Sequence, residues 1–193
     1  EESSNVRIEA RHFSMLADLL SYARRAGIAE AIMNLMETMR TKYDLEPDDA
    51  MFSALVTALG RTSSVGEARQ AEQMLKDLSA RGNANVRAYV AVIYAWVKSG
   101  DKDATRRAEE VFEILMSSSV KPNKVVYRAL LEAWVAAGVK EAATRAIELV
   151  EDYEAKLSQG LTTDDGGDVK LYSLAMRAVW KCNADSAPEI VEK

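Results

Sequence analysis

Basic residues recur at nearly constant spacing along the chain. Arg25, Arg61 and Lys98 stand 36 and 37 residues apart. Lys181 continues the series at the fifth place, and Ala136 interrupts it at the fourth. Like charges stacked along one edge of a protein repel one another, so such a column calls for a counter-charge, which the phosphates of a nucleic acid would supply. A basic residue near the C-terminus of a helix is also favoured by the helix dipole alone, and both interpretations stay open.

A second series contains only aspartate and asparagine. Its members are Asp48, Asn85, Asn123 and Asp168. These short side chains carry fixed donors and acceptors, which suits contact with the edge of a nucleobase. The same residue types are also preferred as the N-cap of a following helix. The series therefore predicts either a recognition surface or a set of helix starts.

Few residues in the sequence are candidates for a catalytic role. His12 is the only histidine, and a single histidine is more often a surface residue than a catalyst or a metal ligand. Cys182 is the only cysteine, so no internal disulfide bond can form, and we expect a half-buried, unreactive thiol. The sequence contains neither a phosphate-binding loop nor a dinucleotide-binding glycine motif. We therefore expect no enzymatic activity, no cofactor and no small-molecule substrate.

Two acidic pairs are the remaining candidates for chemistry. Asp164 and Asp165 lie in a polar, glycine-rich stretch, 159–168. Without a third spaced ligand, this pair predicts a solvated loop rather than a metal site. Glu109 and Glu110 fall on an expected helix and predict a solvated helix face. Neither pair indicates a bound metal ion.

The composition indicates a helical protein with a continuous core. Hydrophobic residues make up 48% of the 193 residues, and only three prolines and nine glycines are present, which disfavours strands and turns. The formal net charge is −5, so any attraction to RNA has to be local. No apolar run approaches the roughly 20 residues needed to span a bilayer. The chain begins with Glu1 rather than methionine, so we expect a processed or trimmed N-terminus.

Repeated helix-turn-helix units position these residues. In the clearest unit, Tyr127, Leu130, Leu131 and Trp134 recur with the spacing of one helix face, and Gly138 is suited to end that helix. A large apolar residue opens the first helix of each unit, at separations of 36, 37, 38 and 45 residues: Leu16, Phe52, Tyr89, Tyr127 and Tyr172. A period in this range indicates a stacked solenoid rather than a single closed core.

Each second helix carries four apolar residues with the spacing of one helix face. These quartets begin at Ile32, Ala71, Ala108 and Ala146. The first quartet begins 16 residues after the opening residue of its unit and the others 19 residues after, which predicts three extra residues in the later turns. We expect Trp96 and Trp134 in the core. We predict one domain, 1–193, with repeats at about 13–48, 49–85, 86–123 and 124–168 and a partial repeat at 169–193.

The chain resembles the pentatricopeptide repeat family over about residues 13–183. The fourth unit matches that family's consensus through Lys121–Asn123, Val125–Tyr127, Leu130–Leu131 and Ala137–Gly138. The second and third units match through Glu46–Asp48, Phe52, Leu55–Val56, Tyr89, Trp96, Lys98–Gly100 and Ala108–Phe112. Tetratricopeptide repeats fit less well. The resemblance implies an all-α, right-handed α-solenoid, a short and atypical member with about four and a half repeats.

The resemblance also implies single-stranded RNA as a ligand, with one base read per repeat. In the family, the residue after the opening residue and the last residue of the repeat read the base. Here the pairs are Ala17 with Asp48, Ser53 with Asn85, Val90 with Asn123, and Arg128 with Asp168. Ser53 with Asn85 resembles a combination associated with adenine, whereas Ala17 and Val90 cannot hydrogen-bond a base. The basic column then supplies phosphate contacts from Arg25, Arg61, Lys98 and Lys181.

Two functions are consistent with these residues. The first is a non-enzymatic adaptor that binds single-stranded RNA in an organelle, which the resemblance implies to be a mitochondrion or a plastid. The alternative is a scaffold that holds protein subunits of a larger organellar complex, because solenoids expose long surfaces. The acidic net charge and the incomplete set of base-reading residues favour the alternative, and the basic column favours RNA.

Overall fold

The computed structural model describes residues 9–23, 25, 27–61, 63–164 and 166–184. Every regular element in this part of the chain is an α-helix. The helices are α1 (Ala10–Tyr22), α2 (Ile28–Tyr43), α3 (Asp49–Leu59), α4 (Val65–Ala80), α5 (Val86–Ser99), α6 (Ala104–Met116), α7 (Lys124–Ala137), α8 (Glu141–Ser158) and α9 (Val169–Ala184). The end of the predicted partial repeat, 185–193, lies outside the described residues.

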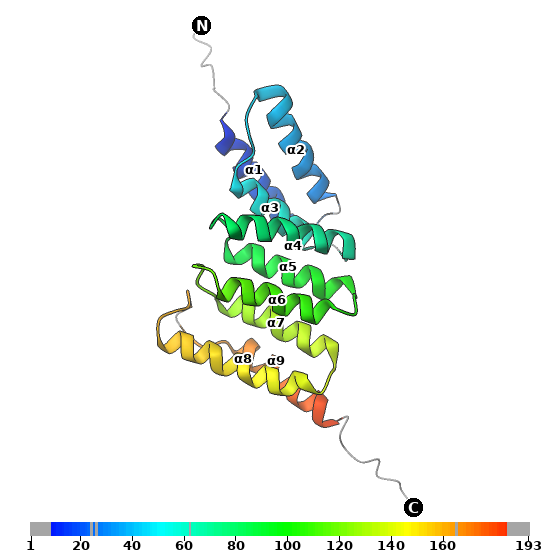
Figure 1. Cartoon of the computed structure of the whole chain (residues 1–193), viewed down its shortest axis with the longest axis vertical. Helices are drawn as coiled ribbons and strands as arrows, with labels where there is room; N and C mark the ends of the chain where they lie inside the picture. The colour runs from blue at the N-terminus through cyan, green and yellow to red at the C-terminus, as the bar shows by residue number, and fades with distance from the viewer. Residues whose placement is uncertain (1–8, 24, 26, 62, 165, 185–193) are drawn as a thin grey trace, which may run out of the picture.

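The helices stack crosswise along one long axis, with α1 and α9 at opposite ends (Figure 1). The odd-numbered helices form one layer, in which α1 packs on α3, α3 on α5, α5 on α7, and α7 on α9. Each even-numbered helix rests on the two odd-numbered helices beside it. The contacts thus join neighbouring units, as in a solenoid. The prediction of an all-helical solenoid is confirmed.

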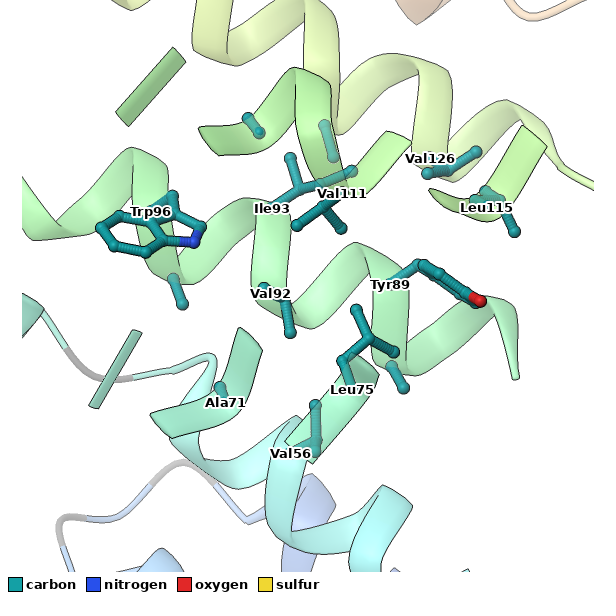
Figure 2. Close-up of a cluster of buried hydrophobic side chains, with 14 of the residues drawn as sticks. Val56, Ala71, Leu75, Tyr89, Val92, Ile93, Trp96, Val111, Leu115 and Val126 are labelled. Atoms are coloured by element: carbon teal, nitrogen blue, oxygen red, sulfur yellow. The ribbon is translucent and has the colours of Figure 1, made fainter. Parts of the chain in front are cut away.

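The core follows the predicted helix faces. Around α5, Tyr89, Val92 and Ile93 have no exposed surface, and they lie between side chains of the helices on either side (Figure 2). Trp96 is 1% exposed, and Trp134 is half-buried against the same core. Both tryptophans therefore belong to the helix-packing surface, as predicted. The quartets of the second helices face the same layer of first helices.

The first repeat begins three residues earlier than the sequence predicted. Phe13 follows the N-cap residue Glu9 by four positions, as Phe52 follows Asp48. Phe13 is 8% exposed and packs on the core, whereas Leu16 is 45% exposed. Phe13 is therefore the opening residue. Its quartet then begins 19 residues later, as in every other unit, so the predicted difference in turn length does not exist.

The insertion in the fourth repeat is anchored rather than solvated. The side chain of Asp164 is 7% exposed, and its Oδ2 accepts hydrogen bonds from the backbone N–H of Lys124 and the hydroxyl of Tyr153. Thr163 N–H donates to the carbonyl of Pro122. The prediction of a solvated loop is therefore wrong for Asp164, which caps the start of α7. Asp165, the other half of the acidic pair, lies outside the described residues.

Two first helices approach closely at Gly60. This residue follows the last turn of α3, with an ordinary right-handed backbone conformation. A Cβ atom at this position would lie 2.3 Å from the carbonyl oxygen and 2.8 Å from the Cβ atom of Ala91 in α5. Only a residue without a side chain fits this α3–α5 contact, so the glycine is required here for space rather than for conformation.

The substitution Gly60→Ala is expected to lower the free energy of unfolding by about 2 kcal/mol, because α3 and α5 must separate to admit the methyl group. Urea unfolding followed by circular dichroism measures the change. Gly66→Ala is the matched control, since the nearest atom to its Cβ is the Ser64 Oγ at 3.6 Å and alanine favours the helix there. Equal stabilities of the two variants would contradict the close approach.

Candidate nucleic-acid interface

The aspartate and asparagine series starts the first helices. Asp48 Oδ1 accepts from Met51 N–H at 2.9 Å, and Asn85 Oδ1 accepts from Ala88 N–H at 3.0 Å. Asn123 Oδ1 accepts from Val125 and Val126 N–H, and Asp168 Oδ1 accepts from Lys170 and Leu171 N–H. All four residues therefore cap the helix that follows them. One oxygen of each side chain is committed to this cap, which leaves its other polar atom for a second contact.

That second contact joins two of the residues to their predicted partner position. Arg128 Nη1 lies 3.5 Å from Oδ2 of Asp168. In the first repeat, Ser14 Oγ donates to Oδ2 of Asp48 at 2.7 Å. Ser14 follows the opening residue Phe13, so the structure brings the two positions that were predicted to read a base together in the first and fourth repeats. In both repeats these side chains bond to each other.

The other members of the partner column differ in exposure. Ala17 has no exposed surface and lies in the core, so it is not accessible to a base, and Ser14 occupies the position after the opening residue instead. Ser53 is only 3% exposed, and Val90 is half-buried. Asn85 is exposed at the start of α5. In the favoured pair, Ser53 with Asn85, only the asparagine is therefore accessible in this conformation.

One side chain of α5 links this helix directly to α1. Arg87, at the start of α5, donates to the carboxylate of Asp18 and to the hydroxyl of Tyr22, both in α1. Its guanidinium also lies 4.9 Å from the centre of the Tyr22 ring. These contacts join the first helices of the first and third units, and α3 lies between them in the layer. Ser53 and Thr57 of α3 are 3% and 6% exposed. Arg87 is thus paired within the protein, although its side chain is still 33% exposed.

The hydroxyl of Tyr94, which lies beside Glu132, is an uncharged hydrogen-bond donor in the same layer of first helices. Burial, with the Glu132 carboxylate beside it, raises the pKa of the Tyr94 hydroxyl to about 12. Arg128 opposes this shift and does not cancel it. The phenol therefore remains protonated near neutral pH, where it can donate a hydrogen bond but carries no charge.

Three of the predicted phosphate contacts line one cleft. Arg25, Arg61 and Lys98 border an open cleft of 1170 Å³ between the C-terminal ends of the first helices and the N-terminal ends of α2 and α4. Glu30 and Glu67 also line it. All three basic residues are exposed. The structure thus gathers side chains from three consecutive units into a single site of mixed, mainly positive charge.

Two of the basic residues also stabilise helix ends. Arg61 Nη1 donates to the carbonyl of Ala23 at 3.0 Å, and Lys181 Nζ donates to the carbonyl of Val135 at 3.2 Å. Each carbonyl belongs to the end of the preceding first helix, where cations are favoured. Lys181 lies beside α7, away from the cleft. Arg25 follows the end of α1. Once Phe13 is the opening residue of the first repeat, the place of the basic column falls on Tyr22, and Arg25 lies three residues beyond it.

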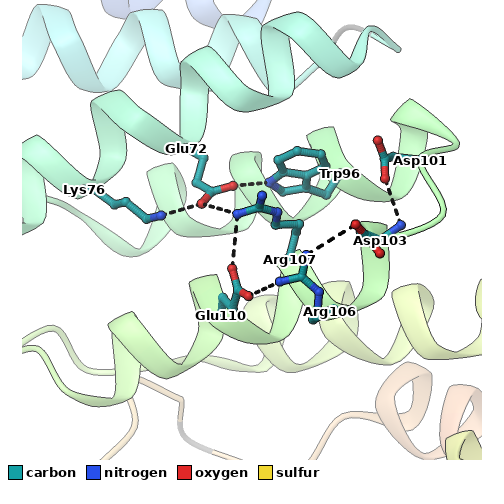
Figure 3. Close-up of polar contacts among 8 residues, drawn as sticks. All are labelled: Glu72, Lys76, Trp96, Asp101, Asp103, Arg106, Arg107 and Glu110. Carbon is teal, nitrogen blue, oxygen red and sulfur yellow. Dashed lines mark hydrogen bonds and ion pairs between the residues drawn. The ribbon is translucent and has the colours of Figure 1, made fainter.

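A buried carboxylate that sequence analysis did not single out joins two units. Glu72 of α4 is 4% exposed, and its carboxylate contacts both Trp96 of α5 and Arg107 of α6 (Figure 3). Its Oε2 accepts from Trp96 Nε1 at 2.9 Å, and its Oε1 lies 2.6 Å from Lys76 Nζ and 3.6 Å from Arg107 Nη1. These contacts satisfy a charge that would be costly to bury alone.

The same arrangement recurs one unit later. Glu109 Oε1 accepts from Trp134 Nε1 at 2.6 Å and from Arg145 Nε at 2.8 Å. The prediction of a solvated face is therefore wrong for Glu109, whose side chain is 15% exposed. We call each set a Trp–Glu–Arg cluster. The signal was present in the sequence, because the glutamates precede the tryptophans by 24 and 25 residues and the arginines by 35 and 36.

The described part of the chain contains neither a metal site nor a membrane-spanning helix. No group of three or more histidine, cysteine, aspartate or glutamate side chains among the described residues is placed to hold a metal ion. No described helix is long and apolar enough to cross a membrane. His12 caps its own helix, because its Nδ1 accepts from Glu9 N–H at 3.0 Å.

Comparison with known proteins assigns the whole array to one repeat type. A sequence model described as the pentacotripeptide-repeat region of PRORP matches residues 1–192. No curated protein matches the chain. The match extends over all of the helices described above, including α9.

Proposed function

The chain belongs to the pentatricopeptide repeat family, and from this membership we propose that it binds single-stranded RNA along its first-helix layer without acting on it chemically. Repeats of this type are in general RNA-associated and non-catalytic, although the region that gives the matching model its name belongs to a nuclease. The chain then serves as a recognition unit. Its ligand is an RNA backbone together with a small number of accessible bases.

The observation that carries the proposal is the cleft lined by Arg25, Arg61 and Lys98. These residues come from three consecutive units of a protein with a net charge of −5. Phosphates spaced along a strand offer the counter-charge that such a cleft favours. Asn85 is the exposed member of the Ser53–Asn85 pair, and its Oδ1 is used by the helix cap, so its amide N–H₂ is the group offered to a base.

The double substitution Arg25→Glu with Lys98→Glu is expected to weaken binding of a short single-stranded RNA about tenfold, and to flatten the dependence of affinity on salt between about 50 and about 200 mM. Arg61 is left in place because it also caps α1. Fluorescence anisotropy with a labelled oligonucleotide measures both effects.

The matched control is Lys42→Glu with Lys121→Glu, which makes the same change in net charge. Both lysines are exposed and follow or end a second helix, at the edge opposite the cleft. We expect this control to bind RNA with nearly the affinity of the natural sequence. Equal losses in the two double variants would point to net charge alone, and no binding by the unaltered chain would rule the proposal out.

We further propose that the protein works in a mitochondrion or a plastid. The association of this repeat type with organelles supports the location. Imaging of the complete gene product fused to a fluorescent protein tests it, with organelle markers for each compartment. A signal confined to the cytosol would count against the proposal.

A protein scaffold remains the second candidate function, and a specific observation favours it. The base-reading positions of the first and fourth repeats bond to each other, through Ser14 with Asp48 and Arg128 with Asp168. A surface whose polar atoms are already paired suits contact with a protein as well as with a base. Co-purification of a stable assembly that survives nuclease treatment would favour this function over RNA binding.

A further inference from the structure

The two end helices expose apolar side chains at positions that are buried in the rest of the array. Four residues after each opening residue stand Ala17, Val56, Ile93 and Leu131, with no exposed surface. The corresponding residue of α9 is Met176, which is 67% exposed. Eight residues after the opening residue, Val135 is 8% exposed and Trp180 of α9 is 72% exposed.

The opposite face of α1 is open in the same way. Six residues after the opening residue, Ala58, Ala95 and Ala133 are 4%, 0% and 2% exposed, whereas Leu19 of α1 is 68% exposed. At the position two residues after the opening residue, Met15 of α1 is 65% exposed, whereas Ala91 of α5 is only 9% exposed. Solenoids normally end in polar caps. Within the described residues, both end helices of this array expose apolar side chains instead.

These two faces are the two halves of one internal contact. Gly60 stands eight residues after its opening residue and touches Ala91, which stands two residues after the next one. The trailing face of a first helix, where Met176 and Trp180 lie in α9, therefore packs on the leading face of the following first helix, where Met15 and Leu19 lie in α1. The array repeats this contact from α1 to α9 and leaves one half open at each end.

We propose that a second copy of this chain docks its α1 on α9, so that copies assemble head to tail. Met176 and Trp180 of one copy then meet Met15 and Leu19 of the next. The contact joins two different surfaces and does not close on itself, so the assembly lengthens with concentration. Among the described residues no second helix follows α9, so the junction has fewer supporting contacts than those within a chain and is expected to be reversible. Residues 1–8 and 185–193 lie outside the described residues.

The test is the mass of the full chain in solution, measured by analytical ultracentrifugation from about 1 to about 100 µM. The average mass is expected to rise continuously above the 21.3 kDa of one chain. Trp180→Glu blocks the α9 face and Leu19→Glu blocks the α1 face, so each variant alone is expected to be monomeric. Trp180→Ser and Leu19→Ser repeat the test with smaller changes, and circular dichroism verifies that every variant keeps its helices.

An equal mixture of Trp180→Glu and Leu19→Glu decides between this contact and any other. Each variant keeps the face that the other lacks, so the mixture is expected to form dimers of twice 21.3 kDa and nothing longer. Assembly of either variant alone, or a mixture that stays monomeric, would overturn the proposal. A natural sequence that stays monomeric at about 100 µM would also overturn it, with the faces then covered by the chain's own termini or by another protein.

Discussion

Replacing Trp96 with alanine is expected to lower the free energy of unfolding by about 4 kcal/mol. Trp96 is 1% exposed and fills the space between α4, α5 and α6. Its loss leaves a large cavity and removes the indole N–H that donates to the buried carboxylate of Glu72. The cavity and the lost hydrogen bond to Glu72 Oε2 act in the same direction, so this substitution is expected to have the largest effect of those considered.

Urea unfolding followed by circular dichroism measures this change without relying on tryptophan fluorescence. Trp134→Ala is expected to cost about half as much, because Trp134 is half-buried although its indole makes the same kind of hydrogen bond. Trp180→Ala, 72% exposed, is the surface control and is expected to change stability by less than about 0.5 kcal/mol in dilute solution. Equal losses at Trp96 and Trp180 would contradict the core assignment.

Replacing Glu72 with alanine is expected to cost about 3 kcal/mol. The substitution leaves the buried indole N–H of Trp96 without its acceptor and Lys76 without its carboxylate, and it removes one of the two carboxylates beside Arg107. Removal of one member of a buried charged network is costly because the remaining members stay desolvated. Lys76 and Arg107 are partly exposed, so water offsets part of the loss.

Glu110→Ala is the matched control for Glu72. Glu110 also pairs with Arg107, but its side chain is 37% exposed, and surface pairs of this kind contribute little. We expect the control to change the free energy of unfolding by less than about 1 kcal/mol. A double-mutant cycle with Trp96→Phe then measures the coupling between the indole and the carboxylate. Additive effects of Glu72→Ala and Trp96→Phe would mean that their hydrogen bond contributes no stability.

Helix positions could be predicted from the sequence because each unit repeats the same local pattern. The faces at Tyr89 and Tyr127 are buried as their periodicity predicted. The exception is instructive, because Phe13 and Leu16 lie one turn apart on α1 and both are apolar. In an internal helix both faces are covered, but α1 has a neighbour on only one side, so spacing alone cannot show which of the two residues packs inward.

The pairing of the site residues could not be predicted in the same way. The helix caps at Asp48 and Asp168 were one of the two alternatives for this series, because a cap depends on residues only three positions away. The bridge from Arg87 to Asp18 joins residues 69 positions apart and depends on how successive units twist against one another. Periodicity determines the faces of helices but not that twist, so the contacts of Arg87 with α1 can be seen only in the structure.

The Trp–Glu–Arg clusters also set the order in which the array loosens. They lie at the two central junctions, and in the outer units Met33 and Ile147 stand where Glu72 and Glu109 stand in the inner ones. Both residues are partly exposed, at 39% and 49%. Backbone amides of α5 and α7 should therefore resist exchange with deuterated water longest, and those of α1 and α9 should exchange first. The two ends of the array are thus expected to unfold locally and independently of each other while the middle remains folded.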